Sequence, residues 1–364
     1  MRSCVEEEEI QMKCIADHAR VFRLPALFLA LLVMLTSFAA AQTKIKLGTL
    51  VPQGTSYHRI LLEMGEKWRQ APDGGVTTVV YAGGSLGGEE DLVRRMRIGQ
   101  IQASMLTVAG LGEIDPGINA LQEIPMVYRS LDEADYVREK LQPMLEKRML
   151  DKGFVVLFWG DVGWIRFFSK EPAYAPKDYL KMKLFVGSGE NDQIELMKAT
   201  GYQVVPLEWS DVLTSLQTGL VDVIPTVPFH ALAGQFFGST RHMLEVNWVP
   251  LVGATVITKK AWDSMSPAKQ AFMLKTATES GKQMESNSRK ENDLAVEAMQ
   301  RRGLQVHPVP AALEAQWRQF AESVYPKIRG HMVPADTFDE VQRLLADYRK
   351  NAKSEVAANS GGKP

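Results

Sequence analysis

Cysteine is nearly absent from this chain: among 364 residues there are only Cys4 and Cys14. Both precede a segment, residues 22–42, with a basic flank, an apolar run and a small-residue ending, which is typical of a secretory signal. We expect residues 1–41 to be removed after Ala41, which would leave the exported protein without cysteine. A disulfide-stapled scaffold and a cysteine nucleophile are thereby excluded.

Long hydrophobic runs are also lacking. The apolar stretch from Leu24 to Phe38 is interrupted by Pro25 and is shorter than the roughly 20 residues that a membrane-spanning helix needs. An uncleaved anchor is the alternative to a cleaved signal. Four consecutive glutamates at residues 6–9 are unusual for a signal, and translation from Met12 would give a basic start instead.

Neither sign of charge dominates, because 42 lysines and arginines face 43 aspartates and glutamates. This balance gives no reason to expect nucleic acid as a partner. The chain has no His-Glu-x-x-His motif, no cysteine cluster and no acidic loop with calcium spacing. We therefore predict neither a metal site nor a cofactor.

The apolar pattern alternates between strand-like and helix-like segments, which favours an α/β fold with largely parallel sheets. We predict strands at 44–51, 76–82 and 101–108, and helices at 56–70 and 89–100. The same order of elements returns at 182–227. Within it, the helix from Asp91 to Gly99 matches the helix from Asp211 to Gly219 at the same spacing. The sequence thus predicts two similarly wired lobes, with a binding cleft at the carboxyl ends of their strands.

A strand at 253–258 is expected to return toward the first lobe. A helix of more than 30 residues follows it and begins at Ser266-Pro267, a plausible N-cap and first helical residue. It is long enough to run across both lobes. Two amphipathic segments at 312–328 and 337–350 follow, and the polar residues 349–364 are expected to be a disordered tail.

A glycine-rich loop at 83–87 fits the Gly-x-Ser-x-Gly pattern of a serine hydrolase, with Ser85 as the nucleophile. Against this hypothesis, few strands precede the loop, no oxyanion motif is present, and no motif fixes the role of a later histidine. A phosphate cradle is also disfavoured, since Glu89, Glu90 and Asp91 would repel an anion at the helix start. We interpret the loop as a tight turn, and we predict no catalytic residue and no enzyme activity.

Aromatic residues concentrate at 156–172, in "VLFWGDVGWIRFFSKEP", around Arg166. Large core residues at a crossing between lobes would explain at least half of them. Tryptophans at lobe boundaries also line clefts, where small-molecule sites are mostly apolar with a few polar groups.

Five segments taken in order resemble the solute-binding proteins of tripartite ATP-independent periplasmic (TRAP) transporters, dicarboxylate-binding (DctP) type. They are "IKLGTLVPQGTSYH", "GGSLGGEEDLVRRMRIGQIQAS", "LQEIPMVYRSLDEA", "GWIRFFSKEPAYAPKDYLKMKLFV" and "VVPLEWSDVLTSLQTGLVDVIPTVP". The resemblance covers nearly all of residues 43–340. It implies a two-lobed periplasmic binding protein fold with hinge strands and a long lobe-spanning helix, closing over a ligand for delivery to membrane permease subunits.

The chain departs from the family where relatives hold a carboxylate. The family pattern Leu-Lys-Ile-Arg-Val-Pro stands here as residues 182–187, with Phe185 at the arginine position. A polar position after Val-Asp-Gly is likewise apolar at Val227. A buried carboxylate without its guanidinium partner faces a desolvation cost of several kcal/mol. We therefore expect an atypical member that lacks the carboxylate-binding arginine.

Arg166 matches a second arginine that often contacts ligand in the family, and Trp209 matches an aromatic residue that packs on it. The predicted ligand-binding residues are Thr55, Tyr57, Thr107, Trp164, Arg166, Phe185, Trp209, Thr226, Val227 and Phe229. The leading hypothesis is a receptor for a hydrophobic or amphipathic small molecule. The alternatives are an organic-acid receptor that uses Arg166 or Lys183, and a secreted hydrolase that uses Ser85.

We expect the first lobe to comprise residues 42–163 and 252–288. The second lobe is expected to comprise 164–251, with 289–348 adding to it and supplying the C-terminal helices. A periplasmic monomer is expected, with a small-molecule ligand and the TRAP permease as partners and without nucleic acid.

Overall fold

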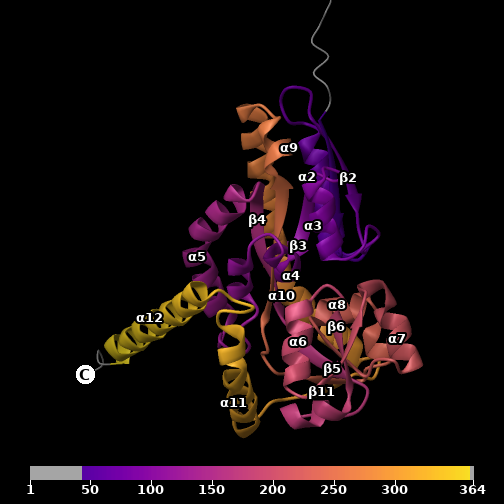
Figure 1. Cartoon of the computed structure of the whole chain (residues 1–364), viewed down its shortest axis with the longest axis vertical. Helices are drawn as coiled ribbons and strands as arrows, with labels where there is room; N and C mark the ends of the chain where they lie inside the picture. Colours follow the sequence, from indigo (N-terminus) through magenta and orange to yellow (C-terminus); the bar gives the residue numbers. More distant parts are fainter. Residues whose placement is uncertain (1–42, 361–364) are drawn as a thin grey trace, which may run out of the picture. The chain divides into compact units, whose positions relative to one another are not determined.

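The computed structural model describes residues 43–360, with side chains described as far as residue 352, and its strands form two sheets (Figure 1). The first sheet has the order β2-β1-β3-β10-β4. Its strands are β1 (Thr43–Thr49), β2 (Val76–Tyr81), β3 (Ala103–Thr107), β4 (Phe154–Trp164) and β10 (Pro250–Thr258). The predicted signal peptide lies outside the described residues.

The second sheet has the order β11-β9-β5-β8-β6-β7. Its strands are β5 (Arg166–Ser169), β6 (Lys183–Gly187), β7 (Gln203–Leu207), β8 (Val223–Thr226), β9 (His242–Leu244) and β11 (Gln305–His307). Buried apolar clusters lie against both sheets, so each sheet is the centre of its own core. The predicted two-lobed α/β architecture is confirmed.

The internal repeat predicted from the sequence is confirmed by the strand pairing. β1 pairs in parallel with β2 and β3, and β6 pairs in parallel with β7 and β8. An antiparallel strand from elsewhere in the chain follows in each sheet, β10 beside β3 and β5 beside β8. Gly99 and Gly219, which end the matched helices, both adopt positive φ, the conformation in which glycine terminates helices most readily.

Helices cover the sheets and connect their strands. The α-helices are α2 (Ser56–Trp68), α3 (Glu89–Arg97), α4 (Val108–Gly112), α5 (Leu131–Asp151), α6 (Asn191–Ala199), α7 (Val212–Thr218), α8 (Pro228–Ala233), α9 (Lys259–Asp263), α10 (Pro267–Gln300), α11 (Ala311–Ile328) and α12 (Ala335–Ser360). Short 3-10 helices are η1 (Pro116–Leu121), η2 (Pro176–Lys181), η3 (Trp209–Asp211) and η4 (Phe236–Gly238). None of the helices in the described part of the chain is both long and apolar enough to cross a membrane.

Two of the places at which the described chain crosses between the sheets lie next to each other. β4 ends in the first sheet at Trp164, and β5 begins in the second at Arg166. Between them, the Ile165 backbone amide donates a hydrogen bond of 2.9 Å to the carbonyl of Val249, just before β10. The two crossings are therefore bonded to each other where the hinge is expected.

The long helix α10 begins as predicted: the Ser266 hydroxyl caps it by accepting from the Lys269 amide, and Pro267 is its first residue. It packs against α2 and β4 of the first lobe and against α8 of the second. Near its middle, a Cβ atom on Gly281 would lie 2.7 Å from Cδ2 of Phe158 on β4. The helix thus spans both lobes, and glycine allows its closest approach to the crossing strand.

The C-terminal helix differs from the expectation in two ways. Residues 289–348 were expected to add to the second lobe, yet Phe338 and Val341 of α12 pack in the cluster around Leu106 of the first lobe. The tail expected from residue 349 is helical as far as Ser360. Arg349 explains the start of this stretch, since its guanidinium donates to both carboxylate oxygens of Glu133 on α5. A composition-based expectation cannot anticipate this tertiary contact.

We predict that Gly281→Ala destabilises the protein, although alanine is normally the better helix former by about 1 kcal/mol. The added methyl group would meet the base of the Phe158 ring, and overpacking of this kind costs typically about 1–3 kcal/mol. Urea unfolding would measure the loss. Ser286→Ala, an exposed site on the same helix, is the matched control and should be neutral or slightly stabilising. A gain in stability for Gly281→Ala would contradict the close packing described.

Candidate functional site

A cavity of about 340 Å³ lies where the carboxyl ends of the parallel strands of both sheets converge. The strand-end residues on its wall include Thr49 and Thr107 of the first sheet and Gly187, Leu207 and Thr226 of the second. Open α/β sheets bind ligands at this edge. Its volume falls within the range of small-molecule sites, so it is the candidate binding site.

Aromatic rings form much of the cavity wall. Phe185 on β6 packs edge-on against Trp209, with ring centroids 4.7 Å apart. Trp209 in turn lies 4.8 Å from His230. Tyr57 of α2 meets Phe229 of α8 at 5.2 Å, which joins the walls contributed by the two lobes. A ligand here contacts large apolar surfaces from both sides.

The structure brings seven of the ten predicted ligand-binding residues to the cavity. They are Tyr57, Thr107, Phe185, Trp209, Thr226, Val227 and Phe229. Of the other three, Thr55 caps α2 by accepting from the His58 amide. Trp164 ends β4 and packs against the first core. The binding role of each residue stays a prediction.

Arg166, the third residue outside the lining, has its guanidinium engaged elsewhere. It donates to the carbonyl of Glu245 at 2.9 Å and to the side-chain oxygen of Asn247. Burial lowers the pKa of Arg166 to about 10. Lys183, the other cation considered for a carboxylate, donates to the carbonyl of Gly219. Neither of the two cations expected to hold an acid lines the cavity.

Glu89 lines the cavity, although from its sequence position it was expected only to stabilise the first turn of α3. Its carboxylate accepts three hydrogen bonds of 2.7–2.8 Å: from the amide and hydroxyl of Thr107 and from the amide of Gly110. Burial raises its pKa, while these donors oppose the increase. Glu89 therefore fixes the start of α4 at the end of β3, and all its described partners are neutral.

Glu123 and Glu190 also line the cavity, and no pattern in the sequence marked either of them. Burial raises the pKa of Glu123 to about 7. Burial, and then the neighbouring Glu123 and Glu89, raise the pKa of Glu190 to about 8. No lysine or arginine contributes to either value. Two carboxyl groups thus share an apolar cavity without a cationic partner.

The cavity as a whole is poor in positive charge. Arg94 is the only lysine or arginine among its lining residues in the described chain, and it is exposed and paired with Asp91. Eight carboxyl side chains line the same space: Glu89, Glu90, Asp91, Glu113, Glu123, Asp161, Glu190 and Glu208. Burial lowers the pKa of His230 to about 4, so this ring is neutral at physiological pH. The lining is therefore unfavourable for an anion.

The rims of the two lobes touch at the cavity mouth. A Cβ atom on Gly88 would lie 3.2 Å from Oε2 of Glu208, and one on Gly189 would lie 3.2 Å from Oε2 of Glu90. These pairs join the start of α3 to the second lobe. The glycine-rich loop therefore leads into the cleft rim, as its interpretation as a turn predicted.

Ser85 lies apart from the cavity and is exposed. The loop around it is held by backbone bonds, from Gly83 to the Val51 carbonyl and from Gly84 to the Thr49 carbonyl. In the described part of the chain no histidine forms a hydrogen bond with the Ser85 hydroxyl. The arrangement therefore gives no support to the hydrolase hypothesis.

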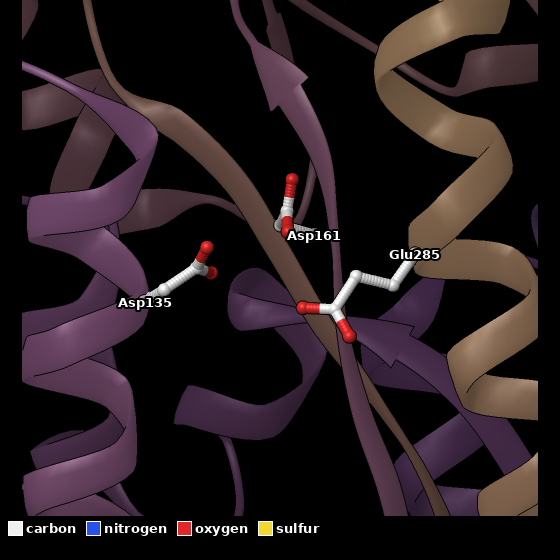
Figure 2. A group of neighbouring side chains, drawn as sticks. All are labelled: Asp135, Asp161 and Glu285. Atoms are coloured by element: carbon white, nitrogen blue, oxygen red, sulfur yellow. The ribbon is translucent and has the colours of Figure 1, made fainter.

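A second acidic group, away from the strand ends, links the crossing strand to two helices. Figure 2 shows Asp135 of α5, Asp161 of β4 and Glu285 of α10 grouped together, with one oxygen from each within 4.8 Å of the others. Arg138 bonds Asp135 and Glu285, and Arg289 pairs with Asp135 and Asp161. Two guanidinium groups already neutralise most of this charge, so the group is better suited to joining α5 and α10 than to holding a cation.

The pKa values of Glu123 and Glu190 predict how stability depends on pH. Both carboxyls hold protons more tightly in the folded cavity than at their ordinary pKa of 4.5. The folded state therefore binds more protons between about pH 4.5 and about pH 8, and the free energy of unfolding should fall as pH rises through that window.

The double variant Glu123→Gln/Glu190→Gln should lose less stability than the wild type between about pH 5.5 and about pH 8.5, as measured by urea unfolding of ligand-free protein. Glu195→Gln, on the exposed face of α6, is the control and should follow the wild type. A double variant with the wild-type pH slope would show that these carboxyls do not titrate abnormally.

Comparison with known proteins identifies the family. Residues 47–330 match the family described as bacterial extracellular solute-binding protein, family 7 (DctP). The C4-dicarboxylate-binding periplasmic protein DctP of Rhodobacter capsulatus is 23% identical over 287 residues, which cover 78% of this chain and 85% of that protein.

Two solved structures of TRAP periplasmic solute-binding proteins share the fold. The protein from Ralstonia eutropha H16, with bound (S)-2-acetolactate, has a TM-score of 0.78 at 19% identity and covers 84% of this chain and 99% of its own. The protein from Fusobacterium nucleatum, with bound sn-glycerol-3-phosphate, has a TM-score of 0.77 at 21% identity, covering 85% and 99%. Since the family match extends over most of the residues, the chain belongs to the bacterial extracellular solute-binding proteins of family 7, the DctP family.

Proposed function

We propose that this protein is the periplasmic receptor of a TRAP-type transporter and captures a hydrophobic or amphipathic small molecule without a carboxylate anchor. The observation that carries this proposal is the Phe185–Trp209 wall, which stands where the family pattern places an arginine. Phe185 is 2% exposed, so its ring is packed into the cavity wall. Apolar contact supplies most of the binding free energy, at about 25 cal/mol per Å² of apolar surface removed from water.

The hinge and the rim support a receptor that closes over its ligand. The two adjacent crossings, between β4 and β5 and between Val249 and β10, would act as a hinge about which one lobe rotates relative to the other. The ends of the strands would line the cleft throughout this motion. The rim contacts, Gly88 with Glu208 and Gly189 with Glu90, would form only when the lobes approach. The joint surface around them is where we expect a permease to recognise the loaded, monomeric receptor.

An organic-acid receptor is the second candidate, because the R. capsulatus relative is a C4-dicarboxylate-binding protein and the R. eutropha structure holds (S)-2-acetolactate. An acid in this cavity would need a cation. Arg166 and Lys183 donate to backbone carbonyls outside it, and Arg94 is paired with Asp91 at an exposed position. These contacts favour the amphipathic ligand over the acid.

We expect Phe185→Arg to weaken binding of the ligand that co-purifies with protein prepared without refolding, by about tenfold or more, because the substitution removes the apolar wall and buries a charge. Calorimetry would measure the affinity, and circular dichroism would check the fold. Phe185→Leu keeps an apolar wall and should lose less. In parallel, no short organic acid should bind the wild type at submicromolar concentration. Unchanged affinity in Phe185→Arg, or submicromolar binding of such an acid, would overturn the proposed ligand class.

A further inference from the structure

We propose that the polar end of the ligand is a protonated amine, which the carboxylates of Glu190 and Glu123 hold at the junction of the lobes. This assignment rests on the proposed function and narrows its ligand to an amphipathic organic cation. The two carboxylates line a part of the cavity wall that is separate from the Phe185–Trp209 pair. Glu190 comes from the second lobe, between β6 and α6, while Glu123 follows η1 of the first lobe.

Glu190 is positioned without a structural task of its own. It is the N-cap residue of α6, but its side chain makes no capping hydrogen bond. Its carboxylate lies over the end of β6, where a Cβ atom on Gly187 would be 2.4 Å from its Oε1 atom. The Gly187 backbone amide forms a hydrogen bond with it, and no lysine or arginine in the described chain contributes to its pKa. A carboxylate kept at a cavity wall in this way is available to a ligand.

Glu123 is similarly available. Its Oε1 atom accepts one bond of 3.2 Å from the side-chain amide of Gln122, which is itself fixed by accepting from the Val252 amide at 3.0 Å. Apolar side chains of Leu196, Met197 and Val324 line the cavity with it. An ammonium group between Glu123 and Glu190 would replace their mutual repulsion with attraction in a medium that screens charge weakly.

A separate polar atom on the cavity wall also calls for a ligand. Tyr57 lines the cavity and is 3% exposed, and within the described chain its hydroxyl meets no partner at hydrogen-bond geometry, although Ser288 lies near enough to lower its pKa. The neighbouring Ser288 hydroxyl donates instead to the Glu285 carbonyl. A buried hydroxyl without a partner costs about 1–3 kcal/mol, and a polar group of a bound ligand would remove that cost.

The groups around the two carboxylates reinforce the preference for a cation. On the side of the first lobe, α3 supplies Glu89, Glu90, Asp91 and the paired Arg94, and Glu113 follows α4. On the side of the second lobe, Asp192 of α6 acts on Glu123 through its charge, and Glu208 lines the rim. The nearest histidine on the wall, His230, is kept neutral by burial. The summed field at the cavity is negative.

The direction of the pH dependence separates a cationic ligand from an anionic one. With pKa values of about 7 and about 8, Glu123 and Glu190 are partly protonated in the empty cavity at neutral pH. A cation binds their ionised forms, so its affinity rises as pH increases until the amine itself loses its proton near about pH 10. An anion would instead accept hydrogen bonds from the protonated carboxyls, and its affinity would fall as pH increases.

The test uses three probes with the same ring and different polar ends: tryptamine, which is cationic; tryptophol, which is neutral; and indolepropionate, which is anionic. Calorimetry on the full-length exported protein should show tryptamine binding about tenfold or more tighter than tryptophol at neutral pH. Its dissociation constant should fall at least about tenfold between about pH 6 and about pH 8.5, with release of protons. Indolepropionate should bind more weakly than tryptophol.

Glu190→Gln should lower the ratio of tryptamine affinity to tryptophol affinity to about one, because only the cationic probe uses the lost negative charge. Glu195→Gln on the same helix should change neither. Equal binding of tryptamine and tryptophol to the wild type would overturn the amine assignment but leave the amphipathic receptor intact. Tighter binding of indolepropionate would overturn both, and so would a failure of all three probes to bind at millimolar concentration.

Discussion

The amide side chain of Asn292 bonds three elements that belong to different parts of the protein, and the relation between the two sheets depends on it. Its oxygen accepts from the Phe229 amide at the start of α8, and its nitrogen donates to the carbonyl of Val162 on β4 and to that of Ser288 in α10. A buried amide that satisfies both donors and its acceptor fixes one geometry. The long helix therefore holds the second lobe against the crossing strand of the first.

This joint explains why the cavity has walls from both lobes. Asn292 bonds the backbone amide of Phe229 in α8, and the Phe229 ring contacts Tyr57 of α2. The parallel strands of each sheet then end toward the same space, because the repeat gives both lobes the same wiring. Residues that would be ordinary strand ends in one lobe line a cavity because the other lobe stands opposite. The binding site is a property of the pairing of lobes.

The sequence predicted what depends on local pattern. The ends of the matched helices at Gly99 and Gly219, the cap at Ser266 and the order of strands and helices along each lobe all follow from turn chemistry and periodicity, and all are confirmed. The family pattern also placed Phe185 on the cavity wall. What it could not provide is the direction of a long side chain: Arg166 lies at the expected crossing between the lobes, but its guanidinium donates to Glu245 and Asn247. Glu123 and Glu190 were missed because they meet only in the folded chain.

Glu190 differs from Thr55, the corresponding helix cap, and from Glu89, a neighbouring buried acid, in ways that suit it to a ligand. Thr55 and Glu190 are the N-caps of the first helix in each lobe, and only Thr55 uses its side chain to bond the helix. Glu89 is also buried at the cleft, but three donors from Thr107 and Gly110 satisfy it, so its charge is compensated by the fold. Glu190 has neither a capping role nor a comparable set of donors. A buried carboxyl without a cationic partner destabilises the empty cavity. The desolvation cost of this carboxyl is therefore already present before binding, and a cationic ligand that neutralises it binds more tightly for that reason.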